Sequence, residues 1–234
     1  MRADSLSLGD TELDGADRLR AFVADMAFPC VGAKSALARG GLVIHRARDL
    51  TSAWDDLQIY AALMAFVARY RTDPVPFQSL AIVFEGPGTL DEAAFETALW
   101  QRAQSLSDKD FWLGQTPDPR ASLDPEDPEF ALSFGGEAFF LVGLHPAASR
   151  PARRFERPTI VFNPHAQFRN LRETDRYEPI RRTILKRDLA LAGTQNPMLA
   201  RFGEVSEARQ YSGRAVDAHW RCPFQSRAIL PDET

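Results

Sequence analysis

Two histidines stand where apolar segments end. His145 closes "EAFFLVGLH", and His165 follows "TIVFNP". Strand ends are places where a rigid scaffold often presents functional side chains. A neutral imidazole is a common metal ligand and can also move protons near neutral pH. A hydrogen-bonded structural histidine explains either position as well, so these residues alone do not establish a site.

The charged residues are unevenly distributed. Between residues 145 and 187, ten arginines and Lys186 occur with only four acidic residues, a net charge of +7, whereas the rest of the chain carries 17 basic and 28 acidic residues, net −11. Such a segment favours an anionic ligand, although pairing with the protein's own acidic surface explains it equally well. The acidic remainder and the lack of an aromatic platform argue against a nucleic-acid partner.

The two cysteines lie in mirrored contexts, Cys30 in "FPC" and Cys222 in "CPF". They could be buried thiols, metal or haem ligands, or a disulfide, which a reducing cytoplasm disfavours. The sequence contains no phosphate-binding loop, dinucleotide fingerprint, zinc-ligand spacing or nucleophile elbow. The commonest chemistries that can be recognised from sequence are therefore excluded.

Hydrophobic periodicity, turn residues and capping signals predict the secondary structure. Helices are expected over 16–26, 52–70, 89–106, 163–173 and 177–191, and strands over 41–47, 77–86, 137–145 and 158–163. No clean alternation of strands and helices is apparent, and a loop alone joins the last two strands. We therefore expect one α+β domain over residues 1–234, with a mostly antiparallel sheet flanked by helices.

If strands 137–145 and 158–163 form a hairpin, His145 and His165 lie at its opposite ends. At most one of them is then the primary ligand of any single metal. The longest apolar stretches are too short to span a membrane, and the first residues lack the layout of a secretory signal. We expect a soluble, cytoplasmic protein that does not bind a membrane.

Six segments together carry a resemblance to a known family. They are "FPCVGAKSAL", "FGGEAFFLVGLHPAASRPARRF", "VFNPHAQFRNLR", "RDLALAGTQNPML", "FGEVSEARQYSGR" and "WRCPF". In this order they resemble the YqcI/YcgG family from about residue 20 to 225. The resemblance implies a haem-dependent oxygenase that N-hydroxylates a small guanidino or amine compound, using haem b and an electron-donating reductase. The alternative is a haem-binding sensor or stress protein that performs no turnover.

The resemblance also implies roles for particular residues. The axial ligand would be His165 or His145, with the Cys30 thiolate as a lower-ranked choice. We favour His165 because Asn163 and Gln167 beside it could orient the imidazole or bond to a distal ligand, although the positive end of a helix dipole weakens a donor nitrogen. The proposed propionate partners are Arg150, Arg153 and Arg154. A cationic substrate also requires nearby carboxylates, and Glu204 and Glu207 are the candidates.

Overall fold

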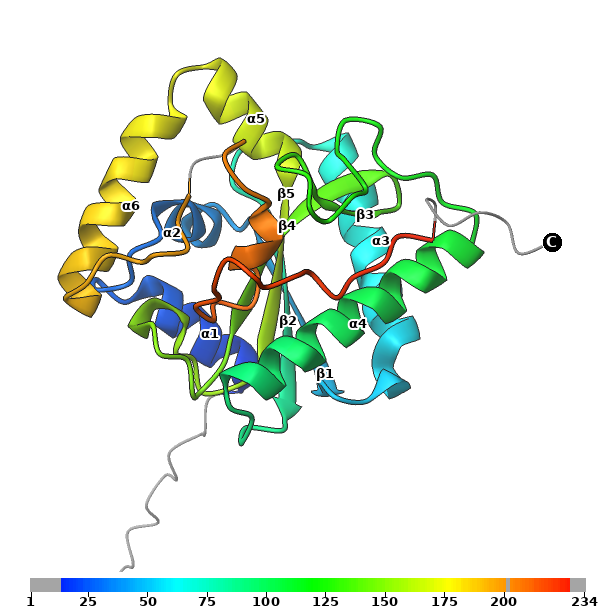
Figure 1. The fold of residues 1–234 in the computed structure, drawn as a ribbon, viewed down its shortest axis with the longest axis horizontal. Coiled ribbons are helices and arrows are strands. Elements are labelled where there is room, and N and C mark those ends of the chain that lie inside the picture. The colour runs from blue at the N-terminus through cyan, green and yellow to red at the C-terminus, as the bar shows by residue number, and fades with distance from the viewer. Residues whose placement is uncertain (1–13, 201–202, 228–234) are drawn as a thin grey trace, which may run out of the picture.

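The computed structural model describes residues 14–200 and 203–227 as an α+β fold around one five-stranded sheet (Figure 1). The strands are β1 (Leu42–Asp49), β2 (Ser79–Gly86), β3 (Leu132–Phe134), β4 (Glu137–Leu144) and β5 (Thr159–Pro164). The helices are α1 (Gly15–Ala24), α2 (Val31–Ala38), α3 (Asp56–Thr72), α4 (Glu92–Trp112), α5 (His165–Glu173) and α6 (Tyr177–Ala192), with short turns η1 (Ala53–Asp55), η2 (Pro151–Arg153) and η3 (Glu207–Gln210). No helix within these described ranges is both long and apolar enough to cross a membrane.

The strand order is β1-β2-β5-β4-β3, and only β1 and β2 run parallel. The mostly antiparallel sheet predicted from the sequence is therefore confirmed. The parallel pair was not expected. It arises because α3 connects β1 to β2 as a crossover, which parallel neighbours require.

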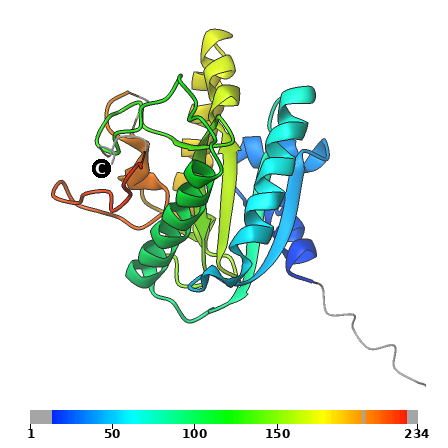
Figure 2. The same ribbon diagram turned by 90° about the vertical axis from the view of Figure 1, so that its right-hand side faces the viewer.

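One face of the sheet carries the main core, beneath α3 and α4 (Figure 2). Phe84, Phe139 and Phe162 from three strands are each no more than 1 % exposed there. Gly143 on β4 lets α4 approach closely, because a Cβ atom at this position would lie 2.6 Å from the Phe95 ring. Burial of these aromatic side chains supplies most of the driving force that holds the two helices on the sheet.

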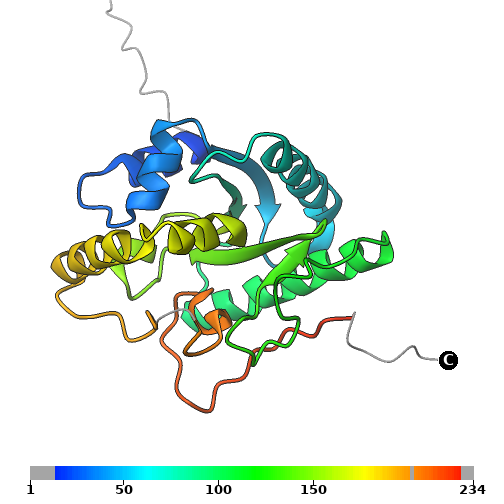
Figure 3. The ribbon, with the colours of Figure 1, turned by 90° about the horizontal axis from the view of Figure 1, so that it is seen from above.

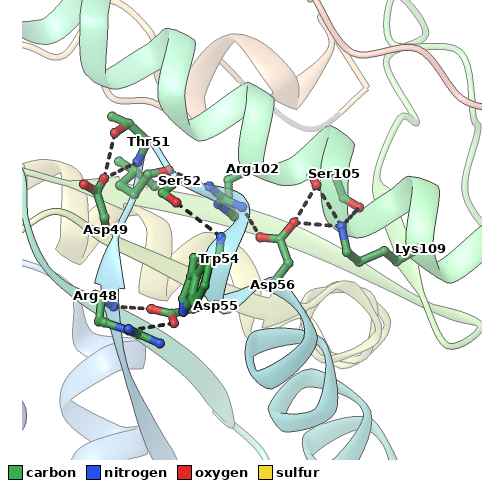
Figure 4. A network of polar contacts seen from close by, with 11 residues as sticks. Arg48, Asp49, Thr51, Ser52, Trp54, Asp55, Asp56, Arg102, Ser105 and Lys109 are labelled. Atoms are coloured by element: carbon green, nitrogen blue, oxygen red, sulfur yellow. Dashed lines mark hydrogen bonds and ion pairs between the residues drawn. The ribbon is translucent and has the colours of Figure 1, made fainter.

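A buried polar network ties the start of α3 to α4 (Figure 4). Asp56 forms an ion pair with Arg102, accepts a hydrogen bond from Lys109 Nζ at 2.8 Å and accepts another from Ser105 Oγ at 2.5 Å. The Arg102 guanidinium also donates to the carbonyl of Leu50 at 3.0 Å. Because the side chains of Asp56 and Arg102 are 1 % and 4 % exposed, each is the necessary counter-charge of the other.

The other face of the sheet is covered by α1 and α2, which pack with Ala81, Val83 and Leu144 in a second, smaller apolar cluster. Figure 3 shows α5 and α6 following one another along the same side of the sheet as these two helices. The main contacts of α6 are with α2, α5 and η2 rather than with a strand. This second face contains the candidate site.

Three local predictions were wrong: Leu57 on the buried face of the helix expected over 52–70, Thr89 as the N-cap of the helix over 89–106, and Asn163 as the N-cap of the helix over 163–173. The side chain of Leu57 is 70 % exposed instead of sharing the buried face of α3, and the N-cap of α4 is Asp91 rather than Thr89. Asn163 was predicted to cap α5, but it belongs to β5, where its amide accepts from Ser79 Oγ at 2.7 Å and donates to the carbonyl of Phe140 at 3.2 Å. Cross-strand bonds replace the expected cap.

Candidate functional site

The centre of the second sheet face is only half covered. Phe140 and Val142 of β4 stand directly opposite Asn163 and Val161 of β5 in the register, so the four side chains lie on one face. All four are half-buried, although they belong to interior strands, whereas the alternating residues on the other face are buried. We call these four residues the open face. An incompletely covered apolar surface on interior strands is typical of a ligand-binding region.

Helix α6 shows the same incomplete burial. Asp188 is the one residue within this helix that is buried. The apolar side chains at helical spacing, Ile180, Ile184 and Leu185, are only half-buried. Since α6 contacts α2, α5 and η2, its apolar side faces the rest of the molecule. The half-burial of that side shows that it is less tightly packed than a hydrophobic core.

His165 lies at the end of β5, two residues after Asn163 of the open face. Its side chain is 4 % exposed, and its Nε2 lies 3.3 Å from Glu207 Oε2 on η3. The half-buried Glu207 carboxylate favours the tautomer of His165 in which Nε2 carries the proton. In this tautomer the lone pair of the imidazole is on Nδ1. A histidine held by a carboxylate in this way can act as a metal ligand or as a proton carrier.

Two further residues surround the Glu207 carboxylate. The Arg172 guanidinium lies over the Tyr177 ring, 5.5 Å from its centroid. Burial lowers the pKa of Arg172, and the charge of Glu207 opposes that shift. Burial and the same carboxylate raise the pKa of Tyr177. The sequence prediction did not include Arg172 and Tyr177, because neither stands at a strand end.

His145 lies far from this group. In the register, Leu144 pairs with Thr159 and Phe139 pairs with Pro164, so His145 and His165 are at opposite ends of the β4–β5 hairpin, roughly 20 Å apart along the strands. The His145 ring stacks on Phe95 of α4 with centroids 4.3 Å apart, and burial lowers its pKa. The two histidines cannot bind one metal together, as the hairpin argument predicted.

Gln167 is held by the protein backbone. Its Oε1 accepts from the amide of Gln78 at 3.1 Å and its Nε2 donates to the carbonyl of the same residue at 3.2 Å. Both ends of the carboxamide therefore fasten α5 to the residue that precedes β2. This pairing leaves Gln167 in a structural position, and its predicted contact with a bound ligand would require these bonds to break.

Arg153 and Cys30 lie together beside the open face. The Arg153 guanidinium donates to the carbonyls of Gly143, Tyr211 and Gln210 at 3.0, 3.4 and 3.2 Å. Cys30 is the N-cap of α2, and its Sγ accepts from the amide of Ala33 at 3.4 Å. Burial raises the pKa of the Cys30 thiol, and the nearby charge of Arg153 opposes the shift. Both residues retain accessible surface.

The other two predicted propionate partners are engaged differently. Arg150 forms an ion pair with Asp188 and also donates to Thr194 Oγ1 at 3.0 Å, which fastens η2 to α6. Arg154 donates to the carbonyls of Ala148 and Ser149 within its own loop. Of the three arginines, Arg153 is therefore the one beside the open face without an ion-pair partner among the described residues.

Segment 207–214 completes the site beside β4, along the residues that follow the short pairing of β4 with β3. The amide of Gly143 donates to the carbonyl of Tyr211 at 2.7 Å, and Glu96 of α4 accepts from Ser212 Oγ at 3.0 Å. Glu96 also forms an ion pair with Arg214. These bonds hold Glu207 at His165. Glu204, the other predicted carboxylate, is exposed.

A separate hollow lies beside the C-terminal turns of α4, with Asp110 and Arg227 as its charged lining residues. Asp110 accepts from Tyr60 Oη and from the amide of Gly135, both at 2.8 Å. Arg227 forms an ion pair with Asp108 at 2.8 Å. Both charged groups are thus engaged within the protein, and the open face is the stronger candidate for a functional site.

The comparisons with known proteins agree with the arrangement of the motifs. The model of the YqcI/YcgG family matches residues 19–225, which include every residue of the open face, His165, Glu207 and Arg153. Neither a comparison with curated proteins nor one with solved structures finds a significant match. Because the family model covers most of the chain, the protein belongs to the YqcI/YcgG family.

Proposed function

We propose that the protein is a haem-dependent oxygenase that N-hydroxylates a small guanidino or amine compound. The observation that carries the proposal is the open face, an apolar surface on interior strands with His165 and Glu207 at one end and Arg153 beside it. A haem site requires an apolar wall, an axial donor and cations for the propionates. All three kinds of group are present here.

The donors in the described ranges suit haem better than a bare metal ion. No group of three or more His, Cys, Asp or Glu side chains in those ranges could hold a metal ion. Haem brings four nitrogen donors of its own, so one protein ligand is enough. His165 would hold the iron through Nδ1, with Glu207 fixing the tautomer. Because His165 is 3 % exposed, binding requires the side chains around it to give way.

Bound haem would supply the activation of oxygen or peroxide. The protein's part is to bind and orient the reactants. Phe140, Val142 and Val161 would exclude water from the reacting centre. Glu207 would keep the imidazole electron-rich, and the exposed Glu204 carboxylate would attract a cationic substrate towards the segment that carries both residues.

Oxygen-dependent turnover also needs an electron donor, for which α6 offers a surface. Arg182, Lys186 and Arg187 are exposed on this helix, and Arg176 caps it; none of the four forms an ion pair with a described residue. Most other arginines of the described chain are paired with acidic groups or with carbonyls. An acidic electron-transfer protein fits such a surface, because complementary charges steer its encounter with the helix.

Turnover distinguishes the oxygenase from a haem sensor. The haem-loaded protein, given a chemical reductant and oxygen or given hydrogen peroxide, is incubated with arginine or agmatine, and products are identified by mass spectrometry. We expect a product heavier by one oxygen atom. Haem binding without any product from either compound would contradict the oxygenase and leave the sensor as the function.

A further inference from the structure

We propose that Arg153 is the receptor for a carboxylate group that enters the open face. The inference rests on the proposed function only for the identity of the molecule that bears the carboxylate, which would be the haem or an amino-acid substrate.

The guanidinium of Arg153 is only partly satisfied by the protein. Its five N–H groups make three contacts with protein acceptors, all of them backbone carbonyls, through Nη1 and Nη2. The Nε hydrogen and one Nη2 hydrogen have no acceptor among the described residues. Nε and Nη2 are a pair of neighbouring nitrogens through which a guanidinium grips a carboxylate in two parallel hydrogen bonds. The protein therefore positions Arg153 through backbone carbonyls while leaving Nε and one hydrogen of Nη2 without a protein acceptor among the described residues.

The charge of Arg153 is not balanced by an ion pair among the described residues. The carboxylate whose charge acts on Arg153, that of Asp188, is already paired with Arg150, and the Cys30 thiol stays protonated because burial raises its pKa. Burial also lowers the pKa of Arg153 to about 10. A half-buried cation that lacks a carboxylate carries a desolvation cost, and an incoming anion would offset that cost.

The backbone around the Arg153 side chain fixes its place. Gly213 has a φ of +87°, and a Cβ atom there would lie 3.3 Å from Arg153 Cγ. The carbonyl of Gly143 that binds Arg153 belongs to the strand that carries Val142 of the open face. The guanidinium is thus held at the edge of the half-covered apolar surface, where a ligand with an apolar body and an acidic end would bring its carboxylate.

The test compares ligands with and without the carboxylate on the wild-type protein. Hemin is compared with hemin dimethyl ester by absorbance titration, and arginine with agmatine by calorimetry on both the haem-free and the haem-loaded protein. We expect at least one acid to bind about 10- to 100-fold more tightly than its partner that lacks the acid group. The pair that shows the difference identifies the carrier of the carboxylate.

Variants then assign the preference to Arg153. In Arg153→Gln the ratio should fall to near one, whereas Arg154→Gln, the neighbour that bonds only within its own loop, should keep it. A ratio near one for both ligand pairs in the wild type, no binding of any of the four ligands, or a preference that survives in Arg153→Gln would overturn the inference. A protein that takes up no hemin but binds arginine more tightly than agmatine would support Arg153 as the carboxylate receptor and refute the haem proposal. The failure of one proposal can therefore be told from the failure of the other.

Discussion

The Glu207 carboxylate lies 3.3 Å from Nε2 of His165, across 42 residues of chain. This contact joins two of the segments that carry the family resemblance, "VFNPHAQFRNLR" and "FGEVSEARQYSGR". It changes the expected role of Glu207, which we first assigned to substrate binding. In this position the carboxylate orients the imidazole of the histidine and fixes its tautomer.

The contact predicts a specific effect on haem affinity. Glu207→Gln should weaken hemin binding by about 10- to 100-fold, because a neutral carboxamide orients His165 less firmly and makes it a poorer donor. Glu204→Gln, an exposed change in the same segment, serves as the control and should bind hemin as the wild type does. Absorbance titration measures both, and equal affinities for the two variants would refute the role of Glu207.

The buried network between α3 and α4 predicts an effect on stability. Asp56→Ala leaves the Arg102 guanidinium buried without its counter-charge and should lower the free energy of unfolding by about 3–5 kcal/mol. Asp56→Ala combined with Arg102→Met removes the isolated charge, so it should be less destabilised than the single variant. Urea denaturation measures these two variants and the single variant Arg102→Met. A double variant as unstable as the sum of the two single variants would show that the pair does not act as a unit.

Asp110 predicts a dependence of stability on pH. Burial raises the pKa of Asp110 above its usual 3.8 in the folded protein. As pH rises above 3.8 the unfolded chain loses this proton first, so the wild type loses stability until the folded carboxyl also ionises. Asn at this position keeps the oxygen that accepts from Tyr60 and Gly135. Asp110→Asn should therefore gain stability relative to the wild type at pH 7 but not at pH 3.5, as thermal unfolding at the two pH values will show.

The fold was largely predictable because most of its elements carry local signals. The periodicity of residues 177–191 and the apolar runs at 137–145 and 158–163 gave α6, β4 and β5 within one or two residues. Helix α2 was missed, since it is only eight residues long and is capped by the sulfur of Cys30 rather than by a common capping side chain. The parallel pairing of β1 with β2 depends on tertiary packing that no local pattern records.

The site was less predictable, because its contacts join distant parts of the chain. Position at a strand end singled out His165, which the structure places at the end of β5, two residues after Asn163 of the open face. It gave the same weight to His145, which stacks on Phe95 instead. Whether an arginine is paired depends on residues far away in sequence, such as Asp188 for Arg150, so the sequence could not separate Arg150 and Arg154 from Arg153.

The cationic surface of α6 predicts salt-sensitive binding of an acidic electron carrier. A purified ferredoxin or flavodoxin with an acidic surface should bind the wild type, and the affinity should fall as salt rises. Arg182→Glu combined with Lys186→Glu should weaken binding about tenfold or more without changing hemin uptake. Arg39→Glu is the control, since Arg39 is exposed and forms no ion pair with a described residue but lies outside α6. An equal loss of affinity for the carrier in the double variant and in Arg39→Glu would contradict the role of α6. Tighter binding of RNA than of the carrier would contradict it as well.

Hemin titration of the purified protein, followed through the Soret band, tests the central claim most directly. We predict stoichiometric binding by the wild type, with loss or a marked shift of the band in His165→Ala. The band should persist in His145→Ala, whose imidazole lies at the other end of the hairpin, and in Cys30→Ala. A wild-type protein that takes up no hemin, or a His165→Ala variant with an unchanged spectrum, would contradict the account.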